Sequence, residues 1–199
     1  MTVHPIEAQS LRILADRIDL SHLPPGSRAV TERVIHASAD LEFASTMVIS
    51  EAAVEAGVAA IKAGAPAVVD VEMVRAGISG YPTTCLLAEV EAQPGGFPTR
   101  SALAVRAAGV RHPDGAIWIN GCAPTALREV LDLAASGDIR PALVIGLPVG
   151  FVGAAEAKTA ARQQTALPTI TNVGEKGGSA VAAATFNALV RLARTETAR

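Results

Sequence analysis

Apolar residues in the first third of the chain recur at roughly helical intervals, which is typical of amphipathic helices. The pattern predicts a first helix over residues 6–18. Pro24-Pro25-Gly26 predicts a turn, after which Ser27 is a candidate N-cap for a helix over residues 28–38. Ser50 is a candidate N-cap for a third helix, which we expect to end near Gly64.

Beyond residue 64, short apolar runs alternate with longer segments of helical spacing. The runs predict β-strands over residues 67–71, 116–120, 142–146 and 169–172, with a weaker candidate over 83–90. The longer segments predict helices over residues 99–110, 124–136, 153–165 and 179–193. This alternation favours a mainly parallel sheet with helices on both faces. Because no linker or repeat interrupts it, we expect one three-layer α/β/α domain over residues 1–199.

The composition narrows the class of protein. Half of the residues are hydrophobic and 18% are charged, which is enough apolar content for a buried core. The formal charge of −2 argues against a nucleic-acid partner. No apolar run reaches the roughly 18 residues of a membrane span, and the first residues lack a signal-peptide pattern. Cys85 and Cys122 form no CxxC pair, so we expect reduced thiols and a cytoplasmic location.

Polar and glycine-bearing segments follow the predicted strands. Asp70 follows the first strand, and loops over residues 120–125, 147–153 and 172–179 lead from later strands into helices. Ligands of open parallel sheets bind at this edge, and helix N-termini there favour anions. The alternative is that the glycines only form tight strand-to-helix turns. The candidate ligand-binding residues in these loops are Gly121, Thr125, Gly150, Phe151, Lys176, Gly178 and Ser179.

Common motifs are missing from the chain. It has no GxGxxG fingerprint for a dinucleotide, no GxxxxGK[ST] loop for a nucleotide phosphate and no GxSxG elbow of a serine hydrolase. No pair of histidines has the spacing of metal ligands. We therefore expect no metal site and no bound cofactor.

His36 is the histidine with the most suggestive position. It lies at the C-terminal end of a predicted helix, where the helix dipole favours an imidazolium, and Asp40 and Glu42 follow closely. Arg100 stands at a predicted helix start, where a cation opposes the dipole, so its position suggests a role beyond helix stability. Taken alone, His36 reads as a structural helix-end residue, Arg100 as an exposed arginine, and Ser10 as a neutral surface serine.

Longer segments of the chain resemble the precorrin-8X methylmutase family. The resemblance runs from about Ile6 to Leu192. It rests on RVIHASADLEF around His36, KAGAPAVVDVEMVRAGI, the TRS at Thr99–Ser101, GCAPTAL, PALVIGLPVGFVGAAEAK and KGGSAVAAATFNAL.

The resemblance implies a flavodoxin-like α/β/α fold and a homodimer. It implies an isomerase of cobalamin biosynthesis that moves a methyl group from C-11 to C-12 of precorrin-8X and gives hydrogenobyrinate. A cobalt-containing counterpart of this reaction yields cobyrinate. The family's histidine falls on His36, and its substrate-contacting serine and arginine fall on Ser10 and Arg100.

The chain departs from the family pattern at several positions. It has Cys122 where the family usually has Asn, Glu175 where Arg is frequent, and Ala157 where Ser is frequent. Replacement of a cation by Glu175 leaves open which group at this loop would bind a substrate carboxylate.

The expected reaction is an acid-assisted 1,5-sigmatropic methyl shift. A positioned imidazolium can protonate the conjugated ring, and rigid binding of the ring supplies orientation. Two rival interpretations stay open. One is a corrinoid carrier without chemistry, and the other is an unrelated α/β enzyme for a small phosphorylated or carboxylated ligand.

Overall fold

The computed structural model describes residues 4–197, so both ends of the expected 1–199 domain lie outside the described part. Its sheet has five strands in the order β1-β5-β4-β3-β2. The short strand β1 (Met47–Ile49) forms one edge and pairs with β5 in the antiparallel direction. The other four strands are parallel neighbours: β2 (Ala67–Val69), β3 (Ile117–Asn120), β4 (Leu143–Gly146) and β5 (Thr169–Asn172).

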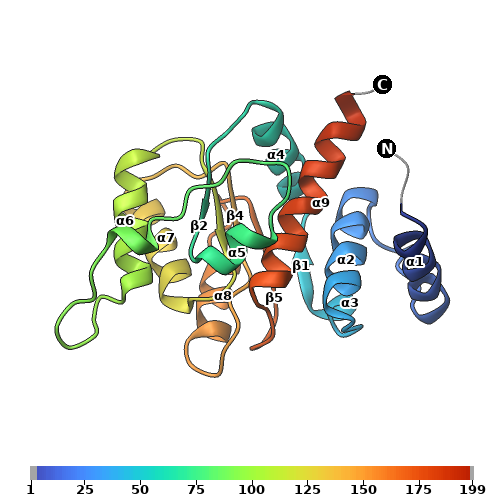
Figure 1. The fold of residues 1–199 in the computed structure, drawn as a ribbon, viewed down its shortest axis with the longest axis horizontal. Helices are drawn as coiled ribbons and strands as arrows, with labels where there is room; N and C mark the ends of the chain where they lie inside the picture. Colours follow the sequence, from blue (N-terminus) through green and yellow to red (C-terminus); the bar gives the residue numbers. More distant parts are fainter. Residues whose placement is uncertain (1–3, 198–199) are drawn as a thin grey trace.

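Helices cover both faces of this sheet (Figure 1). Side chains alternate along the strands, so Trp118 contacts one group of helices while Ile117 and Ile119 contact the other. This arrangement confirms the predicted three-layer α/β/α fold with a mainly parallel sheet. The first group is α6 (Arg100–Arg111), α7 (Pro124–Ser136) and α8 (Ala154–Gln163), and the second is α2 (Pro25–Ser38), α4 (Glu51–Lys62) and α9 (Ser179–Thr197).

The strand order explains why α6, α7 and α8 share a face. From β2 to β5, each parallel strand is added on the same side of the strand before it. Right-handed crossovers that always move in one direction place their helices on one face. A flavodoxin-like sheet has the order 2-1-3-4-5 and reverses direction once. The strand order of this chain therefore departs from the flavodoxin-like expectation, although the layers agree with it.

The weak strand candidate over residues 83–90 is wrong. In this segment Thr84 alone bridges to β2: its N–H donates to the carbonyl of Ala67 at 2.8 Å, and its own carbonyl accepts from Val69 at 2.9 Å. A 3-10 helix, η1 (Leu87–Glu89), then turns the chain away. Pro82 has no N–H to donate, which limits pairing at this edge of the sheet.

Helix α2 begins earlier than the sequence indicates. Its first residue is Pro25, so Ser27 lies inside the first turn and is not the N-cap. The carboxylate of Glu51, the first residue of α4, accepts hydrogen bonds from the N–H groups of Gly26 at 2.8 Å and Ser27 at 3.1 Å. A side chain from another helix thus satisfies N–H groups that a local cap would otherwise bind.

Helix α1 (Pro5–Arg17) lies at the outside of the molecule beside α2 (Figure 1). It buries Leu14, while most of its other side chains face solvent. Two further short helices, α3 (Phe43–Thr46) and α5 (Glu72–Gly77), flank the sheet. Among the described residues, no helix combines the length and the apolar content that crossing a membrane requires.

Candidate active site

The loops after β4 and β5 lie against each other at the carboxyl edge of the sheet. The Gly150 N–H donates to the carbonyl of Glu175 at 3.1 Å, and the Gly178 N–H donates to the carbonyl of Leu147 at 2.9 Å. Gly177 fits so closely that a Cβ atom there would lie 2.3 Å from the Leu147 carbonyl oxygen. The two glycine-bearing loops therefore form one continuous surface.

His36 lies in the last turn of α2 and is hydrogen-bonded to helix α1. Its Nδ1 lies 2.8 Å from the hydroxyl oxygen of Ser10. The sequence thus places 26 residues apart two side chains that the fold brings into contact. Because Ser10 engages Nδ1, the ring nitrogen left to approach a ligand is Nε2.

A cluster of charges holds α1 in the position that this contact needs. The carboxylate of Glu7 accepts from Arg33 of α2 at 2.9 Å and from Arg191 of α9 at 2.7 Å. The hydrogen bond from Arg191 is the main reason that the pKa of Glu7 is lowered, and the charge of His36 adds a smaller lowering. The imidazole therefore lies within the electrostatic reach of this carboxylate.

Lys176 joins the loop after β5 to the segment that follows His36. Its Nζ lies 2.7 Å from a carboxylate oxygen of Asp40 and 2.7 Å from one of Glu42. The hydrogen bond from Lys176 is the largest cause of the lowered pKa of Asp40, and the two carboxylates raise the pKa of Lys176. The ammonium proposed from the sequence as a ligand for a substrate carboxylate is thus already paired within the chain.

Arg100 begins α6, where the hydroxyl of Thr99 caps the helix and lies 2.7 Å from the hydroxyl of Thr125. The Arg100 guanidinium donates to the carbonyl of Leu87 at 2.8 Å and is exposed. Helices α6 and α2 cover opposite faces of the sheet and lie on opposite sides of it in Figure 1. Within one chain, the structure therefore does not bring Arg100 beside His36.

Asp70, at the end of β2, occupies the N–H groups ahead of α7. Its carboxylate accepts from Gly121 at 3.1 Å and from Cys122 and Ala123 at 2.8 Å each, and the residue is 2% exposed. Burial raises the pKa of the Asp70 carboxyl, and these three hydrogen bonds oppose that effect. The helix end that the sequence suggested for anions from a ligand is therefore already occupied by a carboxyl group of the protein itself.

Gly121 and Ser179 are neighbours in the structure. A Cβ atom on Gly121 would lie 3.0 Å from the Cα of buried Ser179 and 2.8 Å from the side chains of Val74 and Ala182. The absence of a side chain at Gly121 thus lets the β3–α7 loop approach the start of α9. This packing requirement accounts for the glycine without a ligand.

Apolar side chains project into solvent from the loops after β4 and β5. Phe151 is 90% exposed and Val152 is 87% exposed, and Val149 and Val173 are about half exposed. Scattered exposed apolar residues are common, but four on two adjoining loops form a patch that favours a ligand or a protein partner. The patch adjoins Gly150, whose φ of 145° is a conformation that side chains rarely adopt.

Comparison with known proteins identifies the family of the chain. The sequence matches the family model for precorrin-8X methylmutase over residues 5–192. This chain belongs to the precorrin-8X methylmutase family. It is therefore an isomerase of cobalamin biosynthesis.

Curated relatives and a solved structure agree with this membership. A cobalt-precorrin-8 methylmutase of Methanocaldococcus jannaschii is 38% identical, and the alignment covers 94% of this chain and 88% of the relative. A precorrin-8X methylmutase of Pseudomonas aeruginosa is 36% identical, with 92% and 93% covered. A crystal structure of a precorrin-8X methylmutase from Thermus thermophilus superimposes with a TM-score of 0.86 at 38% identity, covering 96% of each chain.

Sequence reasoning missed Lys158, a buried cation behind the candidate site of this methylmutase. Its side chain is 0% exposed, and its Nζ donates to the side-chain oxygen of Asn172 at 3.1 Å and to the carbonyl of Lys176 at 2.6 Å. The helical spacing of apolar residues in the sequence did indicate that this lysine is buried. Lys158 shares a helix face with Ala154 and Ala161, both fully buried, so helical periodicity alone places it inside.

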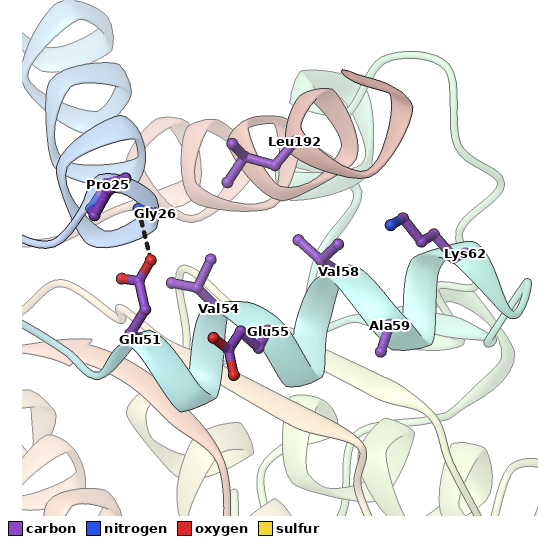
Figure 2. Close-up of a pocket in the computed structure, with 9 residues that line it drawn as sticks. All are labelled: Pro25, Gly26, Glu51, Val54, Glu55, Val58, Ala59, Lys62 and Leu192. Carbon is purple, nitrogen blue, oxygen red and sulfur yellow. Dashed lines mark hydrogen bonds between the residues drawn. The ribbon is translucent and has the colours of Figure 1, made fainter. Parts of the chain in front are cut away.

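The hollow drawn in Figure 2 lies away from His36. It has a volume of about 350 Å³ and lies between the start of α2, helix α4 and the end of α9. Gly26 and Glu51 line it at the N-terminal end of α2, whereas His36 stands near the C-terminal end of that helix. Among the side chains that the structure describes, no three of His, Cys, Asp or Glu gather as a potential metal site.

Proposed function

We propose that this methylmutase moves a methyl group from C-11 to C-12 of precorrin-8X, giving hydrogenobyrinate, and that His36 is the acid. The observation that carries the proposal is the 2.8 Å contact between Ser10 and His36 Nδ1. In an imidazolium both ring nitrogens donate, so Nδ1–H donates to Ser10 and Nε2–H points to the substrate. Proton transfer from Nε2 then leaves a neutral imidazole that Ser10 still holds in place. After the methyl shift the product gives the proton back to Nε2, because substrate and product are isomers.

A 1,5 methyl shift within a conjugated ring is assisted by protonation and by rigid binding. Positioned acids typically contribute about 10²–10⁴-fold to a rate. The proposal requires no resident metal or cofactor, and the proton on Nε2 is the group that the protein supplies.

The substrate is a flat ring edged with acetate and propionate groups. We propose that its apolar face lies on the patch of Val149, Phe151, Val152 and Val173, which is otherwise exposed to water. Gly150 and Gly178 lie in the same two loops, and their N–H groups hold the loops together. Arg100 is the proposed carboxylate ligand, since a guanidinium binds carboxylates in a forked geometry.

We further propose that the enzyme is a homodimer in which the second copy brings its own Arg100 toward His36. The support is the separation of α6 and α2 within one chain (Figure 1) together with the exposed apolar patch. In an equal mixture of His36→Ala and Arg100→Ala chains, about a quarter of all sites would be intact if two subunits share each site. Recovery of activity on mixing the two inactive variants is expected. Activity that stays absent in verified mixed dimers contradicts the shared site.

The cobalt-containing reaction is the second candidate, because relatives such as that of M. jannaschii are named cobalt-precorrin-8 methylmutases. Identities of 36–38% to relatives with either name do not separate the two substrates. We place the enzyme in the cytoplasm, in agreement with its two free cysteines.

The direct test incubates the purified protein with precorrin-8X and, separately, with its cobalt-containing counterpart while absorbance spectra are recorded. Conversion of the metal-free pigment to hydrogenobyrinate is the expected result. Faster conversion of the cobalt pigment would show that the cobalt-containing reaction is the preferred one. Tight binding of either pigment without conversion would indicate a corrinoid carrier and would end the enzymatic proposal.

A further inference from the structure

A buried lysine lies beneath the loop that connects β5 to α9. Lys158 projects from α8, and its Nζ donates to Asn172 at the end of β5 and to the carbonyl of Lys176 in the loop. Arg162, one turn further along α8, donates to the carbonyl of Asn172 at 2.9 Å. The amide nitrogen of the Asn172 side chain also donates to the Lys176 carbonyl at 2.8 Å. Three side chains therefore anchor this loop from its inner side.

This anchored loop carries Lys176, whose ammonium reaches the opposite way to Asp40 and Glu42. The backbone of residue 176 is bound from inside by Lys158, and its side chain is bound from outside by the segment that follows His36. Lys176 thus links the buried anchor on α8 to the end of α2. Displacement of the loop would also displace this ion pair.

The energetics argue that Lys158 is not kept for stability alone. Burial lowers the pKa of Lys158 to about 8, because an ammonium loses its hydration inside the protein. The positive charge of Arg162 lowers it further, and the negative charge of Glu175 acts in the opposite direction. Apolar residues of similar volume often replace buried charges without loss of stability. A cation at this place is therefore better explained by the groups that it holds.

We propose that Lys158 is a positioning residue of the methyl shift, which fixes the 173–178 loop so that Lys176 pairs with Asp40 and Glu42 in the segment that follows His36. The inference rests on the proposed function of His36. A substrate edged with carboxylates would be repelled by two unpaired carboxylates near the acid. Lys176 offsets one of these two negative charges and so reduces the repulsion while the loop is in place, and Lys158 keeps the loop in place.

The first test measures the anchor without reference to activity. Amide hydrogen exchange of Gly150 and Gly178 reports the loop contact, since their N–H groups donate across the two loops. Lys158→Met removes both hydrogen bonds of Nζ while keeping a similar volume, and we expect exchange at these two amides to rise about tenfold or more. Lys62→Met on α4 is the matched control and should leave both rates unchanged. Equal exchange rates in Lys158→Met and wild type would overturn the claim that Lys158 anchors the loop.

The second test measures the effect on the reaction through a double-mutant cycle. Lys158→Met and Lys176→Met should each lower kcat/KM about tenfold, and the double variant should lose no more than either single variant. The loss should shrink as salt rises, because salt screens the unpaired carboxylates. Additive losses, or losses independent of salt, overturn the proposed route through Lys176. A residue with a purely structural role would not show this coupling.

If Lys158→Met does not fold, Lys158→Gln serves as the second variant. Its side-chain amide can still donate a hydrogen bond, so it should show the same changes to a smaller extent. Wild-type exchange and turnover in Lys158→Gln, alongside an unfolded Lys158→Met, would make the residue structural and overturn the proposal. If the wild type itself does not convert the pigment, the proposed function fails. The exchange of Gly150 and Gly178 then still decides separately whether Lys158 anchors the loop.

Discussion

Replacement of Asp70 by Asn tests whether a buried carboxylate organises the carboxyl edge. One oxygen of Asp70 accepts from Gly121, and the other accepts from Cys122 and Ala123. Asparagine has a single acceptor oxygen, so at least one of these N–H groups loses its bond and faces an amide N–H instead. The substitution also removes a negative charge from the N-terminal end of α7.

The magnitude follows from these contacts. A hydrogen bond to a charged group contributes about 1.5–3 kcal/mol, and a charge at a helix N-terminus contributes about 0.3–1 kcal/mol. Loss of one bond and of the charge should therefore lower the free energy of unfolding by roughly 3 kcal/mol. Because burial raises the pKa of Asp70, the experiment also reports whether its carboxylate form is the one that accepts the three bonds.

Urea unfolding followed by circular dichroism measures this change. Equal m-values for wild type and variant would indicate that the unfolded state is unchanged. The matched control is Asp132→Asn. Asp132 pairs with Arg128 at 3.1 Å, and both side chains are more than half exposed, so its loss should cost less than about 1 kcal/mol. A loss below about 1 kcal/mol for Asp70→Asn as well would refute the reasoning, because it would mean that the three bonds do not depend on a carboxylate.

Three further outcomes are expected. Ser10→Ala should lower kcat about tenfold, because the imidazole of His36 loses its orienting partner, and a wild-type kcat in steady-state assays would contradict this. Gly177→Ala should reduce turnover strongly, because its Cβ would lie 2.3 Å from the carbonyl oxygen of Leu147 and the loop must move; a crystal structure with an unmoved loop and full activity would contradict it. Lys158 binds a proton in the unfolded chain but not in the folded one between pH 8 and its ordinary pKa of 10.5. Wild-type stability relative to Lys158→Met should therefore rise by about 3 kcal/mol across this window in urea titrations, and a flat difference would argue against a buried ammonium.

Local signals in the sequence are enough for most of the fold. Ser50 and Thr99 cap α4 and α6 through side-chain bonds to residues three positions away, so their role follows from sequence spacing alone. The parallel strands are buried on both faces, so each appears in the sequence as a continuous apolar run that predicts a strand. Strand β1 has three residues and pairs with β5 more than 120 positions away, so local pattern could not indicate it.

Contacts between distant segments explain what the sequence did not predict at the candidate site. Glu51 caps α2 and Asp70 binds the N–H groups ahead of α7, and neither partner is close along the chain. The pairing of Lys176 with Asp40 crosses 136 positions. The contact of Ser10 with His36 is likewise a product of packing between α1 and α2. Resemblance to the family named these last two residues, but only the fold brings their side chains together.

The most direct test of the account compares single-turnover conversion of precorrin-8X by wild type, His36→Ala and the exposed-histidine control His22→Ala, with pigment affinity measured separately. The account predicts that His36→Ala lowers the rate by about 10²–10⁴-fold while the pigment still binds, and that His22→Ala behaves as wild type. Conversion by His36→Ala within about threefold of the wild-type rate would show that this imidazole is not the acid.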